Sequence, residues 1–97
     1  MTSRELVIIL NGISRKKKKF YQQILPGLQQ TCACTVWETK HRDHGIQLGH
    51  EAARLNPDGI FAAGGDGTLN QVLNGILLSK ADGELPSLGI IPLGTGN

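Results

Sequence analysis

The sequence has few aromatic side chains, few cysteines and no long apolar segment. Aromatic residues make up 4% of the 97 residues. The longest apolar runs, such as residues 6–10, are far shorter than the ~20 residues that span a bilayer. The N-terminus also lacks the long apolar stretch and small-residue cleavage site of a signal peptide. We therefore predict a cytoplasmic protein without a membrane-spanning segment.

Only two cysteines are present, Cys32 and Cys34. A structural zinc site needs about four ligands at suitable spacing, and no second cysteine pair exists. Positions two apart on a strand point to one face, so we expect both thiols to be reduced and buried in one core layer. The three histidines, His41, His44 and His50, lack supporting ligands and are expected at the surface or at helix caps. No metal ligand is predicted.

Positive charge is concentrated in one short run, residues 15–19, whereas the rest of the chain is mildly acidic. A nucleic-acid-binding domain usually spreads positive charge over a larger face and adds aromatic stacking groups. Only Phe20 and Tyr21 lie near this run. We therefore expect no nucleic-acid partner. The run is interpreted as a solvated helix start, with attraction to ATP phosphates or to an anionic membrane surface as alternatives.

Strand and helix patterns alternate along the chain. Apolar or β-branched runs predict strands at residues 6–10, 31–39, 58–63 and 88–91. Helical spacing of apolar residues predicts helices around residues 20–28, 46–55 and 69–77. Ser14 is expected to cap the first helix, which should kink or end at Pro26, and Asp43 or His44 should open the second. The alternation predicts a Rossmann-like three-layer α/β/α fold with a mostly parallel sheet.

Polar and glycine-rich segments follow the predicted strand ends. In parallel sheets ligands bind outside the carboxyl ends of the strands, where these segments would meet. Thr39 ends the second strand at the same edge. The segments are residues 11–14, 64–68 and 93–97.

The strongest pattern is a glycine turn between a predicted strand and a helix, Gly64-Gly65-Asp66-Gly67-Thr68. Glycines let the backbone approach a ligand, and the N–H groups at a helix start attract anions, so the turn suits a phosphate chain. Asp66 would repel phosphates unless it accepts backbone N–H bonds or faces a Mg²⁺ that bridges them. Thr68 could cap the helix and donate to a phosphate oxygen.

Two common phosphate motifs are excluded. The Walker motif needs a Gly-Lys pair, which occurs nowhere in the chain. A dinucleotide fingerprint that began at Gly65 would need glycine at position 70, which is Asn70.

The glycine turn resembles the signature loop of the diacylglycerol, sphingosine, NAD and 6-phosphofructo kinase superfamily. Residues 90–97, Ile-Ile-Pro-Leu-Gly-Thr-Gly-Asn, resemble the second glycine loop of its diacylglycerol kinase and bacterial lipid kinase branch. They do not resemble the Gly-Ile-Asn stretch of NAD kinases. The two motifs and the helix expected between them extend this resemblance over essentially the whole chain.

The resemblance implies a role for individual residues. Asn11 matches the asparagine of the first loop, although the sequence continues with Gly12 where proline is commoner. Thr39 matches a threonine that contacts nucleotide, and Asp66 is the residue implied in catalysis. The remaining positions implied to contact ATP are Gly64, Gly65, Gly67, Thr68, Leu69, Asn70, Gln71, Gly94, Thr95 and Gly96.

The resemblance implies an ATP- and Mg²⁺-dependent kinase that phosphorylates the hydroxyl of diacylglycerol or a related lipid. The lipid pocket, proton acceptor and further metal ligands belong, in that family, to a following β-rich domain. We therefore expect residues 1–97 to be the N-terminal part of the ATP-binding domain of a two-domain kinase that works peripherally at the membrane. Alone, this part should bind nucleotide weakly.

Two alternatives stay open from the residues. One is an NAD-kinase-like small-molecule kinase, and the other is a non-enzymatic nucleotide-binding module. An open sheet edge could also pair with a second copy, so a homodimer is an allowed assembly.

Overall fold

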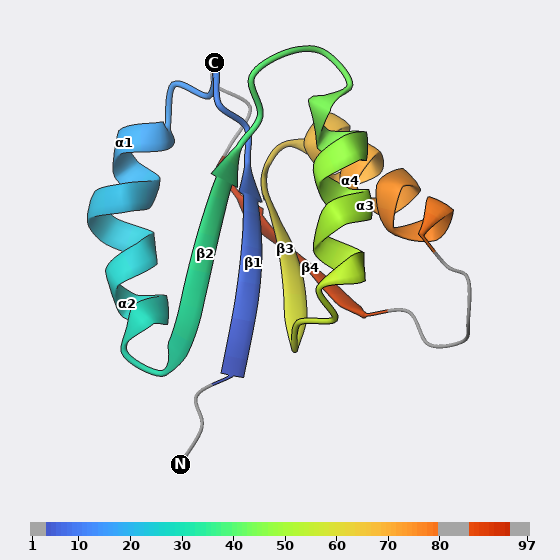
Figure 1. Cartoon of the computed structure of the whole chain (residues 1–97). Helices are drawn as coiled ribbons and strands as arrows, with labels where there is room; N and C mark the ends of the chain where they lie inside the picture. The colour runs from blue at the N-terminus through green and yellow to red at the C-terminus, as the bar shows by residue number, and fades with distance from the viewer. Residues whose placement is uncertain (1–3, 80–85, 94–97) are drawn as a thin grey trace.

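Four parallel strands form the centre of the molecule in a computed structural model that describes residues 4–79 and 86–93. Along the sheet the strand order is β2-β1-β3-β4. Figure 1 shows this sheet between two layers of helices. The strands are β1 (Arg4–Leu10), β2 (Cys32–Glu38), β3 (Gly59–Gly64) and β4 (Ser87–Pro92).

The helices lie on opposite faces because the direction of travel along the sheet reverses after β2. The connection from β1 to β2 crosses one face, and the connections to β3 and β4 cross the other (Figure 1). Since parallel crossovers are right-handed, reversing the direction of travel reverses the face. The three-layer α/β/α prediction is confirmed. The first face carries α1 (Lys17–Lys19), η1 (Phe20–Ile24) and α2 (Leu25–Gln29), and the second carries α3 (His44–Arg54) and α4 (Asp66–Leu78).

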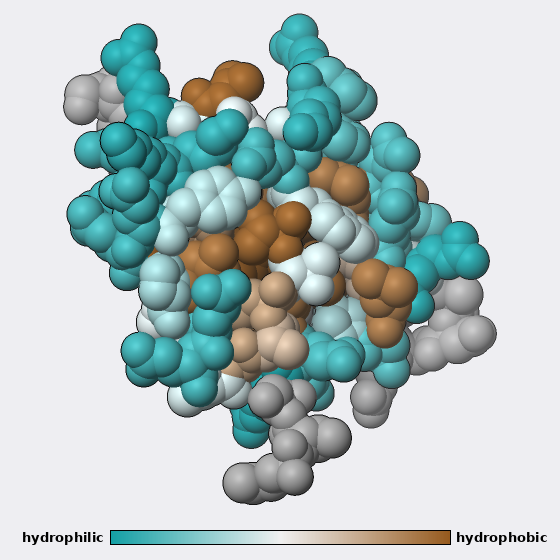
Figure 2. Space-filling model, turned by 60° about the vertical axis from the view of Figure 1, so that its left-hand side comes forward, coloured by the Kyte–Doolittle hydropathy of each residue, from teal (hydrophilic) through white to brown (hydrophobic). Residues whose placement is uncertain are grey.

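The apolar run of β1 serves both layers. Val7 and Ile9 pack in a cluster with residues of α3 and α4. Ile8 and Leu10 pack in a second cluster around Phe20 of the opposite layer. Alternating side chains of a strand point to opposite faces, so a strand between two helical layers must be apolar throughout. Figure 2 shows apolar side chains gathered in the middle of the drawn face and hydrophilic ones around them.

Of the two outcomes predicted for the first helix at Pro26, a kink or an end, the end is wrong. The helix does not end at Pro26 but continues to Gln29. It widens into a π turn over Phe20–Ile24, where the Leu25 N–H donates to the Phe20 carbonyl. Pro26 has no N–H and cannot make the ordinary helical hydrogen bond. The irregular bond of the π turn is made by Leu25, one residue before the proline. Ser14 does not cap this helix, because the helix begins later, with Lys16 as its N-cap residue and no side-chain cap. The Ser14 Oγ instead accepts from the Lys16 N–H at 3.0 Å, in the turn before the helix.

The two thiols are less buried than predicted. Cys32 and Cys34 are both free but only half-buried. They belong to β2, which lies at the edge of the described sheet and has a neighbour on one side only. Partial burial still raises the pKa of the Cys34 thiol. Within the ranges 4–79 and 86–93, no helix is long and apolar enough to span a membrane.

Helices α3 and α4 approach so closely that two glycines are required between them. A Cβ on Gly75 would lie 2.0 Å from the carbonyl oxygen of Ile46, and one on Gly49 would lie 2.5 Å from that of Val72. By contrast, no atom lies within 4 Å of the Cβ position of Gly27 in α2. The contact between α3 and α4 therefore depends on side-chain-free backbone.

We predict that Gly75→Ala destabilises the fold, because overpacking against rigid backbone costs about 1–3 kcal/mol or more. Gly27→Ala is the matched control and should stabilise by about 0.5–1 kcal/mol, since alanine favours a helix without new contacts. Urea unfolding followed by circular dichroism measures both. A Gly75→Ala protein as stable as the wild type would contradict the close approach.

Candidate functional site

The carboxyl ends of three strands are joined by main-chain hydrogen bonds. The Asn11 N–H, just after β1, donates to the Ala63 carbonyl of β3 at 2.9 Å. The Thr39 N–H, just after β2, donates to the Leu10 carbonyl at 2.9 Å. Because β2 and β3 flank β1, the chain changes direction here, and such switch points open a crevice for ligands.

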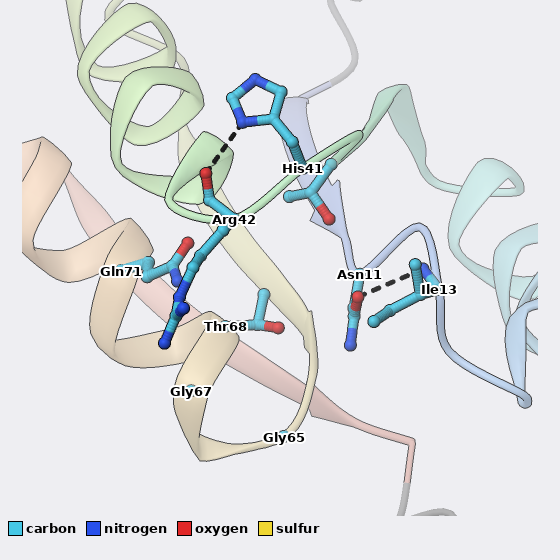
Figure 3. Close-up of a pocket in the computed structure, with 9 residues that line it drawn as sticks. Asn11, Ile13, His41, Arg42, Gly65, Gly67, Thr68 and Gln71 are labelled. Atoms are coloured by element: carbon cyan, nitrogen blue, oxygen red, sulfur yellow. Dashed lines mark hydrogen bonds between the residues drawn. The ribbon is translucent and has the colours of Figure 1, made fainter.

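The first loop turns its amide group toward this crevice. The Asn11 Oδ1 accepts from the Ile13 N–H at 3.2 Å. With the oxygen used in this turn, the Asn11 Nδ2 remains as a donor facing the pocket (Figure 3).

Gly12 explains the departure from the commoner proline. Its N–H donates to the Thr39 Oγ1 at 3.0 Å, which a proline could not do. A Cβ at Gly12 would also lie 2.0 Å from the Thr39 carbonyl oxygen. The Thr39 hydroxyl therefore orders the first loop by accepting this bond, and its own proton remains available to a ligand.

A cluster of Lys17, Glu38 and Tyr21 holds the first loop through the Gly12 carbonyl. The Lys17 Nζ donates to the Gly12 carbonyl at 3.3 Å and to Glu38 at 3.0 Å. The Tyr21 hydroxyl donates to the other Glu38 oxygen at 2.6 Å. These two hydrogen bonds, first from Tyr21 and then from Lys17, lower the pKa of the Glu38 carboxyl. Lys17 thus has a structural partner, whereas the other basic residues of the run are exposed.

The three glycines of the turn have different reasons to be glycine. Gly64 has φ +155°, and a Cβ there would lie 2.9 Å from the Thr68 Oγ1. Gly65 has φ −108°, an ordinary value for any residue. No atom lies within 4 Å of the Cβ position at Gly65 or Gly67. The fold itself therefore requires glycine at position 64 but not at 65 or 67, where bare backbone faces open space.

Helix α4 begins earlier than predicted, at Asp66, with Gly65 as its N-cap residue. The prediction that Thr68 caps this helix is therefore wrong, because Thr68 lies inside the first turn. No side chain in the described part of the chain caps α4. Its first N–H groups and the positive end of its dipole are left for a ligand.

A cavity of about 510 Å³ lies at this edge. It brings together six of the residues predicted from the sequence and adds three that were not, Ile13, His41 and Arg42. Figure 3 shows these side chains around the space between the first loop, the glycine turn and the segment before α3. The predicted six are Asn11, Thr39, Gly65, Gly67, Thr68 and Gln71.

Three predicted residues lie elsewhere on the turn. Asp66, Leu69 and Asn70 line a separate hollow with Leu73, and Gly67 is common to both. Within residues 4–79 and 86–93, no hydrogen bond engages the Asp66 carboxylate, so the expected backbone N–H bonds are not seen.

Gly64 lies buried under the turn, and the second glycine loop continues from the strand beside it. Pro92 of β4 pairs with Gly64, and the Leu93 N–H donates to the Gly64 carbonyl at 3.2 Å. The predicted residues Gly94, Thr95 and Gly96 fall outside the described ranges.

The residues that sequence reasoning missed come directly after Thr39. His41 was interpreted as a surface residue, and Arg42 was not singled out. Their position after a strand end at the ligand edge was the available indication. Among the described residues no carboxylate lines the cavity, whereas amide nitrogens, a guanidinium and helix N–H groups do. This set of donors suits a polyanion.

We predict an unusual titration of Tyr21, the only tyrosine. Burial and then the bond to Glu38 raise its pKa from 10.0 to about 12. Because the folded-state pKa is raised, the protonated phenol stabilises the fold below pH 10, and this contribution is lost as the pH rises toward 12. In Glu38→Gln the midpoint of tyrosinate absorbance should fall partway toward 10.0, since burial remains.

Glu51→Gln, which alters an exposed side chain of α3, is the control and should leave the midpoint unchanged. A tyrosinate midpoint near 10.0 in the wild type would contradict the cluster of Lys17, Glu38 and Tyr21.

Comparison with known proteins gives one consistent family. A model of the diacylglycerol kinase catalytic domain matches residues 5–97. The chain is 32% identical over 91 residues to "Probable lipid kinase YegS" of Escherichia coli O127:H6 and 34% identical to that of Salmonella newport. Each alignment covers 94% of this chain but only 30% of the relative.

Solved structures show the same fold. The crystal structure of a diacylglycerol kinase from Bacillus anthracis strain Sterne has a TM-score of 0.74 at 22% identity, covering 95% of this chain and 34% of that one. A second structure from this strain reaches 0.79 at 25% identity, covering 95% and 32%.

Proposed function

Because the chain belongs to the diacylglycerol kinase catalytic domain family, we propose that it binds ATP as the nucleotide-binding part of a lipid kinase. The observation that carries this proposal is the bare backbone at Gly65 and Gly67. Neither glycine is required by conformation or by packing, yet both line the cavity at the uncapped start of α4. A polyphosphate would occupy the space that side chains would fill.

The residues of the cavity would bind and orient the phosphates. The first-turn N–H groups of α4 and the Thr68 hydroxyl can donate from one side. The amide nitrogens of Asn11 and Gln71 can donate from the others, because the oxygens of both side chains already accept backbone N–H bonds. Phosphoryl transfer depends mainly on such positioning and on stabilisation of charge.

Mg²⁺ fits this site only as a partner of the nucleotide. Within the described residues no group of three or more histidine, cysteine or acidic side chains could hold a metal. Asp66 is the only carboxylate of the turn and lines the adjoining hollow, which shares Gly67 with the cavity. Mg²⁺ is commonly held by one or two carboxylates together with substrate phosphates. Bound there by Asp66 and the phosphates, Mg²⁺ would neutralise charge on the phosphates.

The acceptor in this proposal is a lipid hydroxyl, such as that of diacylglycerol. Similarity to proteins named lipid kinases supports a lipid acceptor over the small-molecule acceptor of an NAD-kinase-like enzyme. The chain spans about 30% of the length of those relatives. We therefore place the lipid pocket and the proton acceptor in a following β-rich domain, and leave any dimer contact to the open edge of the sheet. Action from the cytoplasm at a membrane surface belongs to the same proposal.

Titration with Mg-ATP, followed by NMR, should shift the amide resonances of residues 64–68 and Thr95 first. Gly67→Ala should weaken binding about tenfold, because its Cβ enters the phosphate space. The same change should leave stability equal or raise it by up to about 1 kcal/mol. Gly27→Ala gains helix propensity without touching the cavity and should bind like the wild type. Resonances of these residues that stay still while others move would contradict the proposed site.

In the longer protein, Asp66→Ala should reduce phosphoryl transfer about 100-fold or more, because a group that stabilises charge at the phosphates is lost. A radiolabelled-ATP assay against a panel of lipids measures this, with Glu51→Gln as a control of unchanged activity. Ordinary activity of Asp66→Ala would show that its carboxylate has no part in the reaction.

A further inference from the structure

We propose that Arg42 binds the phosphate tail of the nucleotide and makes affinity depend on the number of phosphates. This inference rests on the proposed function and assigns a role that the glycine motifs do not include. The Arg42 side chain extends from the segment before α3 toward the first turn of α4, beside Gln71 (Figure 3). There it lines the cavity together with Gly67 and Thr68.

Within the described part of the chain the Arg42 guanidinium has no internal partner. The only ion pair there joins Lys17 and Glu38, and no hydrogen bond engages the Arg42 side chain. Its placement is what matters, because the guanidinium shares a cavity with the positive end of the α4 dipole.

Two positive groups that face one space repel each other unless an anion lies between them. The unfavourable arrangement becomes favourable once a phosphate accepts from both. A guanidinium binds phosphate through two parallel N–H donors, which a helix start alone cannot offer. A nucleotide with more phosphates should therefore gain more from Arg42, and a nucleoside should gain nothing.

The segment that carries Arg42 is held in place by its neighbours. The Lys40 N–H donates to the His44 Nδ1 at 2.8 Å, and the His41 and His44 rings stack with centroids 4.4 Å apart. The His41 Nδ1 lies 2.8 Å from the Arg42 carbonyl oxygen. Asp43, with φ 65°, turns the chain into α3. These contacts close a small loop around Arg42, and they make His44 a positioning residue.

Gln71 couples this loop to the glycine turn. Its Oε1 accepts from the Gly45 N–H at 3.1 Å, which joins the start of α3 to α4. A Cβ on Gly45 would lie 2.7 Å from this oxygen, so a side chain there would displace the Gln71 amide. The Arg42 loop and the first turn of α4 are therefore connected by a direct bond.

The test compares dissociation constants of the full 97-residue chain for Mg-ATP, Mg-ADP, AMP and adenosine by isothermal titration calorimetry. Arg42→Ala should weaken Mg-ATP about tenfold or more, as expected for loss of a charge-assisted bond. The loss of affinity caused by Arg42→Ala should shrink from ATP to AMP, and the dissociation constant for adenosine should change by less than about twofold. Arg42→Lys keeps the charge but not the paired donors, so its affinity for Mg-ATP should lie between those of the wild type and Arg42→Ala. Arg54→Ala removes an exposed arginine in the last turn of α3 and is the control.

A second set of variants tests the positioning role of His44. His44→Ala should weaken Mg-ATP, and His44→Asn should restore much of the binding, because its side-chain oxygen can accept from the Lys40 N–H. In an Arg42→Ala background the His44→Ala change should have almost no further effect, since it acts through Arg42.

Each outcome separates the two claims. A wild-type chain that binds no nucleotide would refute the proposed function itself. A wild type that binds while Arg42→Ala loses equal affinity for all four ligands, or none, would refute the role of Arg42 alone. Additive effects of the Arg42 and His44 changes would refute the positioning role.

Discussion

Main-chain hydrogen bonds at the carboxyl ends of the strands are the constraint on which the site depends. Asn11 is bonded to β3, Thr39 to β1 and Leu93 to Gly64, so four strand ends are fixed relative to one another without side chains. Such bonds tolerate many sequences but few changes of geometry. These bonds fix the strand ends around the cavity, and the side chains of Thr39 and Gln71 then hold the first loop and the start of α3 against them.

Glycine serves three distinct purposes in this small fold. At Gly64 it permits a backbone conformation, and at Gly75 it permits two helices to touch. At Gly65 and Gly67 neither reason applies, and the proposed function accounts for them by the approach of a phosphate chain. Sequence alone cannot separate these cases, because all four positions look alike when written as letters. The separation needs coordinates, since it depends on what a Cβ would meet.

Much of the fold could be predicted from the sequence because its patterns are local. The run of β1 is apolar on both faces, and the glycine turn lies between two periodic segments, so the strands and their order of alternation follow from periodicity. The start of α4 and the half-burial of Cys34 could not be predicted, because they depend on the N-cap geometry and on which strand lies at an edge. Arg42 was missed for a related reason: only the folded chain brings it to the start of α4.

The crevice lies between the two inner strands, β1 and β3, while β4 is the outer strand on the glycine-turn side. Material added beyond β4 would therefore extend the sheet without rebuilding the first loop, the glycine turn or the Arg42 loop. With the function proposed above, a nucleotide-binding part arranged in this way is modular: it could be joined to different substrate-binding domains while its own nucleotide site is kept. Diversification of substrates in such a family would then be expected to occur mainly outside the region that this chain contains.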